Sequence, residues 1–214
     1  MPFDSFRFKN SDSRSQSYLD VSGSSARFHG TLDTKTLGGA GFASQRTTGD
    51  DRSWDLSDYD GIHLNLGKLD GKRYTLTLKD EILPRNPENG REQSTISYEY
   101  DFTSAPEEGL FIPWHALKAT YRGKDKDDAA PLKTKDVKRF SIMMRRYTHP
   151  FENSQEEVLK PNSFFAKQEG DFSLEIKSIS AVSQSGDIEK GNVSGQSEVG
   201  AAGVSLRTQS CSRL

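Results

Sequence analysis

The chain has little cysteine, no long apolar run and no excess of charge of either sign. Its single cysteine, Cys211, has no partner for an intrachain disulfide and cannot build a zinc ribbon, and no apolar h-region follows Met1. No stretch approaches the roughly 20 apolar residues that cross a bilayer. The balance of 29 basic against 31 acidic residues gives no global electrostatic footprint for nucleic acid. We therefore expect a reducing, intracellular compartment, no transmembrane segment and no nucleic-acid partner.

Recognisable catalytic and metal-binding patterns are missing as well. The four histidines lack the HxH or HxxxH spacing that places two imidazoles on one face; they are His29, His63, His115 and His149. There is no G-x-S-x-G motif, and the Gly-rich run 37–46 lacks the G-K-[ST] ending of a phosphate loop, so we interpret its glycines as marks of bulges or of close backbone approach. The sequence predicts no catalytic residue, metal ligand or cofactor. A hydrolase would need two facing carboxylates in a cleft, and the pattern selects no such pair.

The segment RSWDLSDYDGIHLNL, residues 52–66, joins several acidic side chains to an abrupt apolar stretch. It does not fit an EF-hand loop, because position 12 counted from Asp58 is a leucine where a bidentate glutamate is needed. We interpret Asp55, Ser57 and Asp58 as the cap of a turn that leads into a core strand beginning at Ile62. A loop-bound cation such as calcium is the alternative.

Apolar and polar residues alternate along much of the chain, which is the period of a half-buried β-strand. The segments with this strand-like character are 26–32, 62–66, 74–78, 96–102, 139–144 and 172–176. Residues 67–71 form a short Gly-bounded link and predict a hairpin, while 113–117 predicts one helical turn. Strands without βαβ spacing predict an all-β fold, an antiparallel β-sandwich or jelly roll. Its long polar loops, 81–93, 122–136 and 147–169, are where ligands usually bind.

The composition changes beyond Val182, where aromatic residues disappear and serine and glycine dominate. Such a segment cannot bury enough apolar surface to offset the entropy of ordering. The sequence therefore predicts three parts: an unassigned N-terminal arm at 1–17, a jelly-roll domain at 18–183 and a disordered tail at 184–214.

Several blocks, taken in order, resemble one known family. The blocks are ARFHGTLDTKTLGGAGFASQR, WDLSDYDGIHLNL, DGKRYTLTLKDE, SYEYDF, GLFIPWHALKATYRGK, KRFSIMMR and EGDFSLEIKSISAV. Together they resemble the complex I intermediate-associated protein family, the thirty-kilodalton assembly-factor type in its fungal form, over residues 18–183. Two departures stand out: NSDSRSQSYLD replaces the usual Trp-containing opening strand, and residues 146–162 lengthen a connection that is normally short.

This resemblance implies a galactose-binding-like jelly roll, mitochondrial residence and no catalytic residues. It also implies an assembly chaperone for respiratory NADH:ubiquinone oxidoreductase, complex I. The implied partners are complex I subunits or assembly intermediates and other assembly factors, with a peripheral place at the inner membrane.

Two groups of side chains are candidates for partner contact. The basic residues Lys133, Lys135, Lys138, Arg139, Arg145 and Arg146 could meet an acidic partner, but flanking acids favour a solvated face. The aromatic and basic residues least explained by alternation are Trp114, Tyr121, Arg122, Arg145 and Arg146. We expect these five to contact partner subunits.

Other functions and compartments stay open at this point. A carbohydrate-binding β-sandwich module is the alternative function, with Trp54 and Trp114 as rings that could stack on sugars. The ending Ser212-Arg213-Leu214 is a variant of the peroxisomal S-K-L address, and a cytosolic location is a further alternative.

Overall fold

The computed structural model describes residues 3–4, 15–35, 41–49, 51–103, 105, 109–146 and 168–183. The predicted disordered tail lies outside these residues, with Cys211 and Ser212-Arg213-Leu214 in it. So do His149 and the whole of the lengthened connection after Arg146.

The regular secondary structure of the described residues is made of strands and two short 3-10 helices. The elements are β1 (Phe3–Asp4), β2 (Gln16–Ser22), β3 (Ser25–Leu32), β4 (Phe42–Thr47), β5 (Gly61–Leu69), β6 (Tyr74–Lys79), β7 (Ser97–Phe102), β8 (Leu110–Pro113), η1 (Trp114–Ala116), β9 (Lys118–Tyr121), β10 (Lys124–Asp125), η2 (Thr134–Asp136), β11 (Arg139–Arg145) and β12 (Gly170–Val182). Every predicted strand segment and the predicted helical turn are therefore confirmed.

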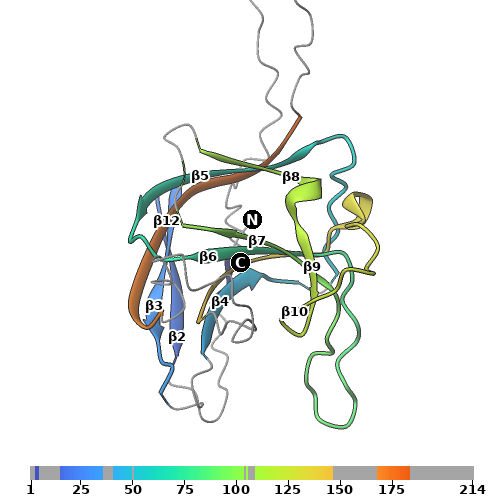
Figure 1. The fold of residues 1–214 in the computed structure, drawn as a ribbon, viewed down its shortest axis with the longest axis horizontal. Coiled ribbons are helices and arrows are strands. Elements are labelled where there is room, and N and C mark those ends of the chain that lie inside the picture. The colour runs from blue at the N-terminus through green and yellow to red at the C-terminus, as the bar shows by residue number, and fades with distance from the viewer. Residues whose placement is uncertain are drawn as a thin grey trace, which may run out of the picture.

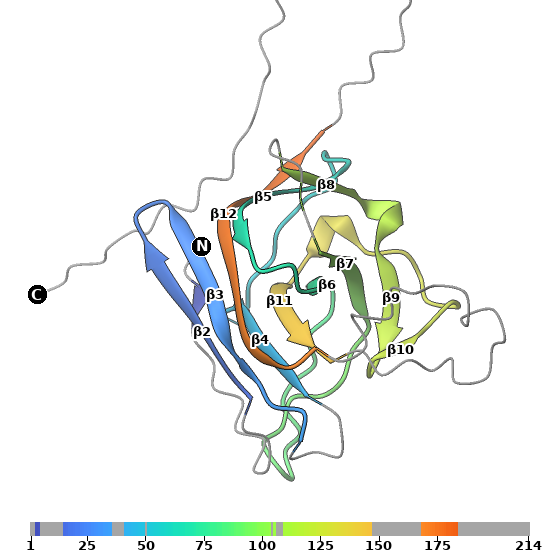
Figure 2. The same ribbon diagram turned by 60° about the vertical axis from the view of Figure 1, so that its left-hand side comes forward.

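The strands form two antiparallel sheets that pack face to face, as Figure 1 shows. One sheet has the order β1-β4-β11-β6-β7-β9-β10, and the other has the order β2-β3-β12-β5-β8. In the second view, β2, β3 and β12 run side by side along one wall of the sandwich (Figure 2). The predicted antiparallel β-sandwich is confirmed.

Alternation along each strand decides which side chains enter the core. On β6, Tyr74, Leu76 and Leu78 are fully buried and face Phe28 and other residues of the opposite sheet. Each fully buried side chain of this size stabilises the fold by about 1.5–3 kcal/mol. Tyr74 carries a polar atom into this core, and its hydroxyl donates to Asp70 Oδ2 at 2.9 Å. Burial and the neighbouring Asp70 charge both raise the pKa of Tyr74, so its hydroxyl stays protonated.

The predicted hairpin at residues 67–71 is wrong. β5 pairs with β12 and β8 in one sheet, whereas β6 pairs with β11 and β7 in the other, so the link is a crossover between the sheets. Asp70 holds this crossover in place, because its Oδ1 accepts the Lys72 N–H at 3.0 Å and its Oδ2 accepts the Ser173 N–H at 2.8 Å. The bond to Ser173 ties the link to the start of β12 and directs the chain away from a hairpin.

Candidate functional site

The acidic segment before β5 is a structural turn. Asp55 Oδ1 accepts the Ser57 N–H at 3.0 Å and the Ser57 hydroxyl at 2.6 Å, and these hydrogen bonds lower the pKa of the Asp55 carboxyl. Trp54 forms a two-way backbone bridge with Val137, with N···O distances of 2.9 and 3.0 Å. No group of three or more metal-ligating side chains forms among the described residues. The Asp55 carboxylate therefore holds the turn before β5 by accepting hydrogen bonds from Ser57.

The basic residues near β11 do not share one face. Arg139 is only 3% exposed and its guanidinium binds the carboxylate of Glu92, so the expected solvated face is wrong at this position. Lys138 pairs with Asp136 at 2.6 Å, while Lys133 and Lys135 are exposed. Basic residues that are close in the sequence therefore have different environments: Arg139 and Lys138 bind different carboxylates, and Lys133 and Lys135 are exposed.

Glu92 fastens the long loop between β6 and β7 to the outer face of the seven-stranded sheet. Its carboxylate binds Arg139 of β11, and its Oε2 lies 2.5 Å from Arg46 Nη1 of β4. Burial alone would raise the pKa of Glu92, but hydrogen bonds from Arg139 and Arg46 outweigh it and hold that pKa below its usual value. This carboxylate is a structural clamp shared by two strands and a loop.

Trp114 is locked against the turn before β5. Its indole Nε1–H donates to the Tyr59 carbonyl at 2.5 Å, its backbone N–H donates to the Asp60 carbonyl at 3.1 Å, and its ring packs on the core. Trp54 is half-buried too and packs edge-on to Phe140 with ring centroids 5.3 Å apart. Neither indole is presented as an open platform for a sugar ring, so nothing at these positions favours the carbohydrate-binding alternative.

Tyr121 and Arg122 lie at the tip of the β9–β10 hairpin. The two-residue loop Arg122-Gly123 has φ values of 53° and 76°, as expected for a type I′ turn. Tyr121 is 39% exposed, and the Arg122 guanidinium lies 5.3 Å from its ring centroid. The tip therefore offers an aromatic ring and a cation on a rigid turn.

Arg145 and Arg146 lie at the other end of the same sheet. Tyr74 pairs with both Met144 and Phe102, which puts the end of β11 near the end of β7, whereas Thr120 pairs with Ser97 at the start of β7. Arg145 Nη2 lies 2.9 Å from Glu99 Oε2 and 3.6 Å from Asp101 Oδ1. The structure thus does not bring the five predicted contact residues onto one surface.

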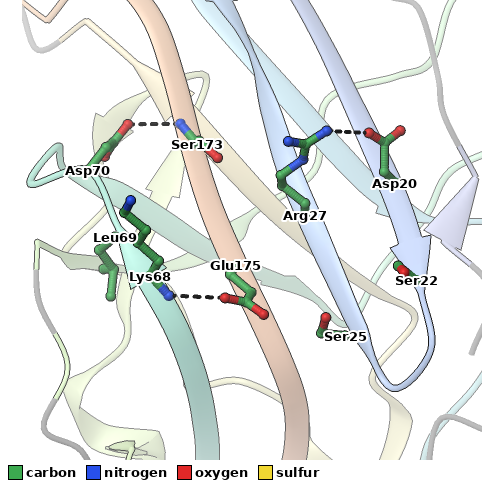
Figure 3. A pocket seen from close by; sticks show the side chains of 9 residues that line it. All are labelled: Asp20, Ser22, Ser25, Arg27, Lys68, Leu69, Asp70, Ser173 and Glu175. Carbon is green, nitrogen blue, oxygen red and sulfur yellow. Dashed lines mark hydrogen bonds and ion pairs between the residues drawn. The ribbon is translucent and has the colours of Figure 1, made fainter.

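A groove that the sequence did not reveal crosses the outer face of the five-stranded sheet (Figure 3). It encloses about 540 Å³, and its lining includes Asp20, Arg27, Lys68, Asp70, Ser173 and Glu175. These residues come from β2, β3, β5, β12 and the crossover after β5. Arg27 Nη2 lies 3.0 Å from Asp20 Oδ2, and Glu175 Oε2 accepts the Lys68 N–H at 3.3 Å. Hydrogen bonds from Arg27 and His29 lower the pKa of Asp20.

Comparison with known proteins identifies the family. The family model described as complex I intermediate-associated protein 30 matches residues 12–176, which is most of the chain. The chain belongs to this family. A relative in Schizosaccharomyces pombe, an uncharacterised protein, is 41% identical over 162 residues that make up 74% of this chain and 65% of that protein. The aligned part therefore spans less than two thirds of the relative's own length.

The matched residues of the complex I intermediate-associated protein 30 family begin before β2 and end at Ile176 within β12. They include every described strand except β1 and the end of β12, together with the Glu92 clamp and the groove. The family is associated with complex I assembly, is an assembly-factor family rather than an enzyme family, and implies a mitochondrial association. Among the described residues, no helix has the length and apolar character needed to span a bilayer.

Proposed function

We propose that this protein is a non-enzymatic assembly factor for mitochondrial complex I that binds partly assembled subunits. The observation that carries the proposal is the family match, because it covers strands of both sheets of the sandwich rather than one local motif. The ionisable side chains around the matched core support it: Glu92 and Asp55 are both engaged in bonds that hold the fold together.

The tip of the β9–β10 hairpin is the part of the proposed contact surface that is best suited to a protein partner. Tyr and Arg are enriched at the energetically important centres of protein interfaces. Tyr121 and Arg122 stand together on a turn whose backbone is fixed by the pairing of Lys124 with Tyr121, so little conformational entropy is lost on binding. Trp114, Arg145 and Arg146 complete the proposed contact residues on other parts of the sandwich.

Deleting the gene tests the function directly. We expect mature complex I to fall and assembly intermediates to accumulate on native gels, and restoration by the wild-type chain. Unchanged complex I bands in the deletion strain would refute the assembly role.

A double substitution then tests the contact surface. Tyr121→Ser with Arg122→Asn removes the ring and the cation, while asparagine still tolerates the positive φ at position 122. We expect the free energy of unfolding of the variant to lie within about 0.5 kcal/mol of the wild-type value. We also expect the variant to fail to co-purify assembly intermediates. The matched control is Val21→Ser, because Val21 is 58% exposed on a different part of the sandwich. Equal recovery of intermediates by the double variant would exclude this tip as the contact.

The proposed compartment is the mitochondrion, with the peroxisome as the alternative through Ser212-Arg213-Leu214. Fluorescent tags placed separately at each end distinguish the two. A mitochondrial signal seen only with the C-terminal tag supports an N-terminal presequence. A peroxisomal signal that the C-terminal tag abolishes would overturn the mitochondrial proposal.

A further inference from the structure

We propose that the groove on the outer face of the five-stranded sheet binds a short extended peptide segment that carries both an acidic and a basic side chain. Binding of such a peptide does not depend on the assembly role, although a partly assembled subunit could supply the segment. The volume of about 540 Å³ lies in the range of sites for small ligands and short peptide segments.

Charges of alternating sign cross the floor of the groove. The strand register puts Asp20 of β2 beside Arg27 of β3, and Arg27 beside Glu175 of β12. Lys68 of β5 follows on the far side of Glu175, because Leu69 and Leu66 pair with Leu174 and Ile176 on either side of it. Adjacent strands are about 4.8 Å apart, so the groove presents four closely spaced charges in the order minus, plus, minus, plus.

The two central charges are held apart although they are neighbours. Oppositely charged residues directly across two antiparallel strands ordinarily attract each other. Here Arg27 instead turns toward Asp20, with an N···O distance of 3.0 Å, and Glu175 turns toward the Lys68 N–H, with an N···O distance of 3.3 Å. Figure 3 shows Arg27 bonded to Asp20 and Glu175 bonded to the Lys68 N–H, and both Arg27 and Glu175 line the groove. A ligand can therefore enter between a guanidinium and a carboxylate.

A β-bulge in β5 creates the place for Glu175. Two residues, Gly67 and Lys68, lie opposite the single residue Glu175, because the register shifts between Leu174 and Ile176. The Glu175 side chain lies directly over Gly67, where an added Cβ would come within 2.5 Å of the Glu175 Cδ. The glycine thus lets this carboxylate lie flat. Lys68 is exposed, and its ammonium makes no ion pair with the other described residues.

The walls of the groove are fixed before any ligand arrives. Asp70 uses both carboxylate oxygens within the fold, accepting from Lys72, Tyr74 and Ser173. Asp20 Oδ2 also lies 2.8 Å from His29 Nε2, at the other side of the groove. A site built from side chains that already hold their positions loses less conformational entropy on binding.

The chemistry of the lining selects the class of ligand. The lining holds two cations, Arg27 and Lys68, and three carboxylates, of which Asp70 has both oxygens bonded within the fold. A purely acidic or purely basic ligand would therefore meet repulsion as well as attraction. Among the described residues, no aromatic ring belongs to the lining, which leaves a sugar without a surface for stacking. An extended peptide with an acidic and a basic side chain two residues apart, and so on the same face, complements the row of charges.

Fluorescence anisotropy of labelled peptides with the full chain tests this proposal. The probe is a capped octapeptide in which lysine and aspartate alternate at every second position with serine between them, so that both charges lie on one face of the extended chain. It is compared with octapeptides that carry only lysine or only aspartate at those positions and with a Ser-Gly octapeptide. We expect the mixed-charge peptide to bind at least about tenfold more tightly than the others, and to weaken as salt rises from about 0.05 to 0.5 M.

Variants locate the binding. Arg27→Gln and Glu175→Gln each remove one charge, and Gly67→Ala displaces the Glu175 side chain without changing any charge. We expect each to weaken binding at least about fivefold, with urea midpoints showing that the variants fold. The control, Lys126→Gln, removes an exposed cation that pairs with Asp128 elsewhere. Equal affinity for single-sign peptides, absence of peptide binding, or groove variants equal to wild type would overturn the proposal. So would glycan binding that Arg27→Gln abolishes, since that result would identify a sugar site.

Discussion

Replacing Glu92 by glutamine should destabilise the sandwich substantially. The carboxylate joins Arg46 and Arg139, whose side chains are only 13% and 4% exposed, while the Glu92 side chain is 28% exposed. Removing one member of a fully buried ion pair costs about 3–5 kcal/mol, and partial solvent screening at Glu92 reduces this to about 2–3 kcal/mol. Glutamine also has an NH2 group in place of one carboxylate oxygen, and this group cannot accept a hydrogen bond from either guanidinium.

Urea denaturation followed by circular dichroism measures this loss. With a slope of about 2 kcal/mol per molar urea, the midpoint of Glu92→Gln should fall by about 1–1.5 M without a change of slope. The control is Glu88→Gln in the same loop, because Glu88 is exposed and only its backbone N–H is bonded, to Asn86. A shift for Glu92→Gln no larger than that of Glu88→Gln would refute the clamp.

The pH dependence of the same pair of proteins provides a second check. The folded-state pKa of Glu92 lies below its ordinary value of 4.5, so near that pH the unfolded chain binds more protons than the folded one. The contribution of the carboxylate is therefore complete above the ordinary value and declines as the pH falls through the folded pKa. The stability difference between wild type and Glu92→Gln should be constant from about pH 7 to pH 5.5 and shrink below about pH 4. A difference that grows on acidification would contradict the assignment.

Two further substitutions test how the sheets are held together. Gln168 is 6% exposed, its Oε1 accepts the Arg73 N–H at 2.5 Å, and its Nε2 donates to the Arg145 carbonyl at 2.8 Å. Because Gln168→Leu removes both bonds, it should lower the free energy of unfolding in urea by about 2–3 kcal/mol. A loss below about 0.5 kcal/mol would show that these bonds contribute little. At Gly61, an added Cβ would lie 2.3 Å from the Ile112 carbonyl oxygen. Gly61→Ala should therefore separate β5 from β8 and lower the free energy of unfolding by about 1–3 kcal/mol. A variant as stable as the wild type would show that the strands have room to move.

Six of the twelve described strands could be predicted, because alternation is a local property of the sequence. β4 shows why a strand can be missed: its inward residues are Ala43, Gln45 and Thr47, all buried, so polar side chains stand where apolar ones would have revealed a strand. The Gly-rich run before it predicts bulges or close backbone approach, and at Gly41 the structure shows close approach, since a Cβ there would lie 2.5 Å from the Asp33 carbonyl oxygen.

Pairing between distant segments could not be predicted in the same way. Residues 67–71 have the glycines of a hairpin, yet the bond from Ser173 to Asp70 joins positions 103 residues apart and no local pattern announces it. The burial of Arg139 similarly depends on Glu92, which lies 47 residues away in a loop. The groove needed residues from four strands and a bulge; Gly67 inside a strand was the local signal that could have pointed to it.

The two outer faces of the sandwich use their charges differently, and this difference bears on where partners bind. On the seven-stranded sheet, Glu92 lies between two arginines and Arg145 lies beside Glu99, so those charges hold strands and loop together. On the five-stranded sheet, Arg27 and Glu175 are cross-strand neighbours that turn away from each other and stay open to a ligand. Neutralising a charge on the first face should therefore mainly lower stability, whereas neutralising one in the groove should mainly lower binding. A groove variant that loses stability without losing peptide affinity would contradict this division.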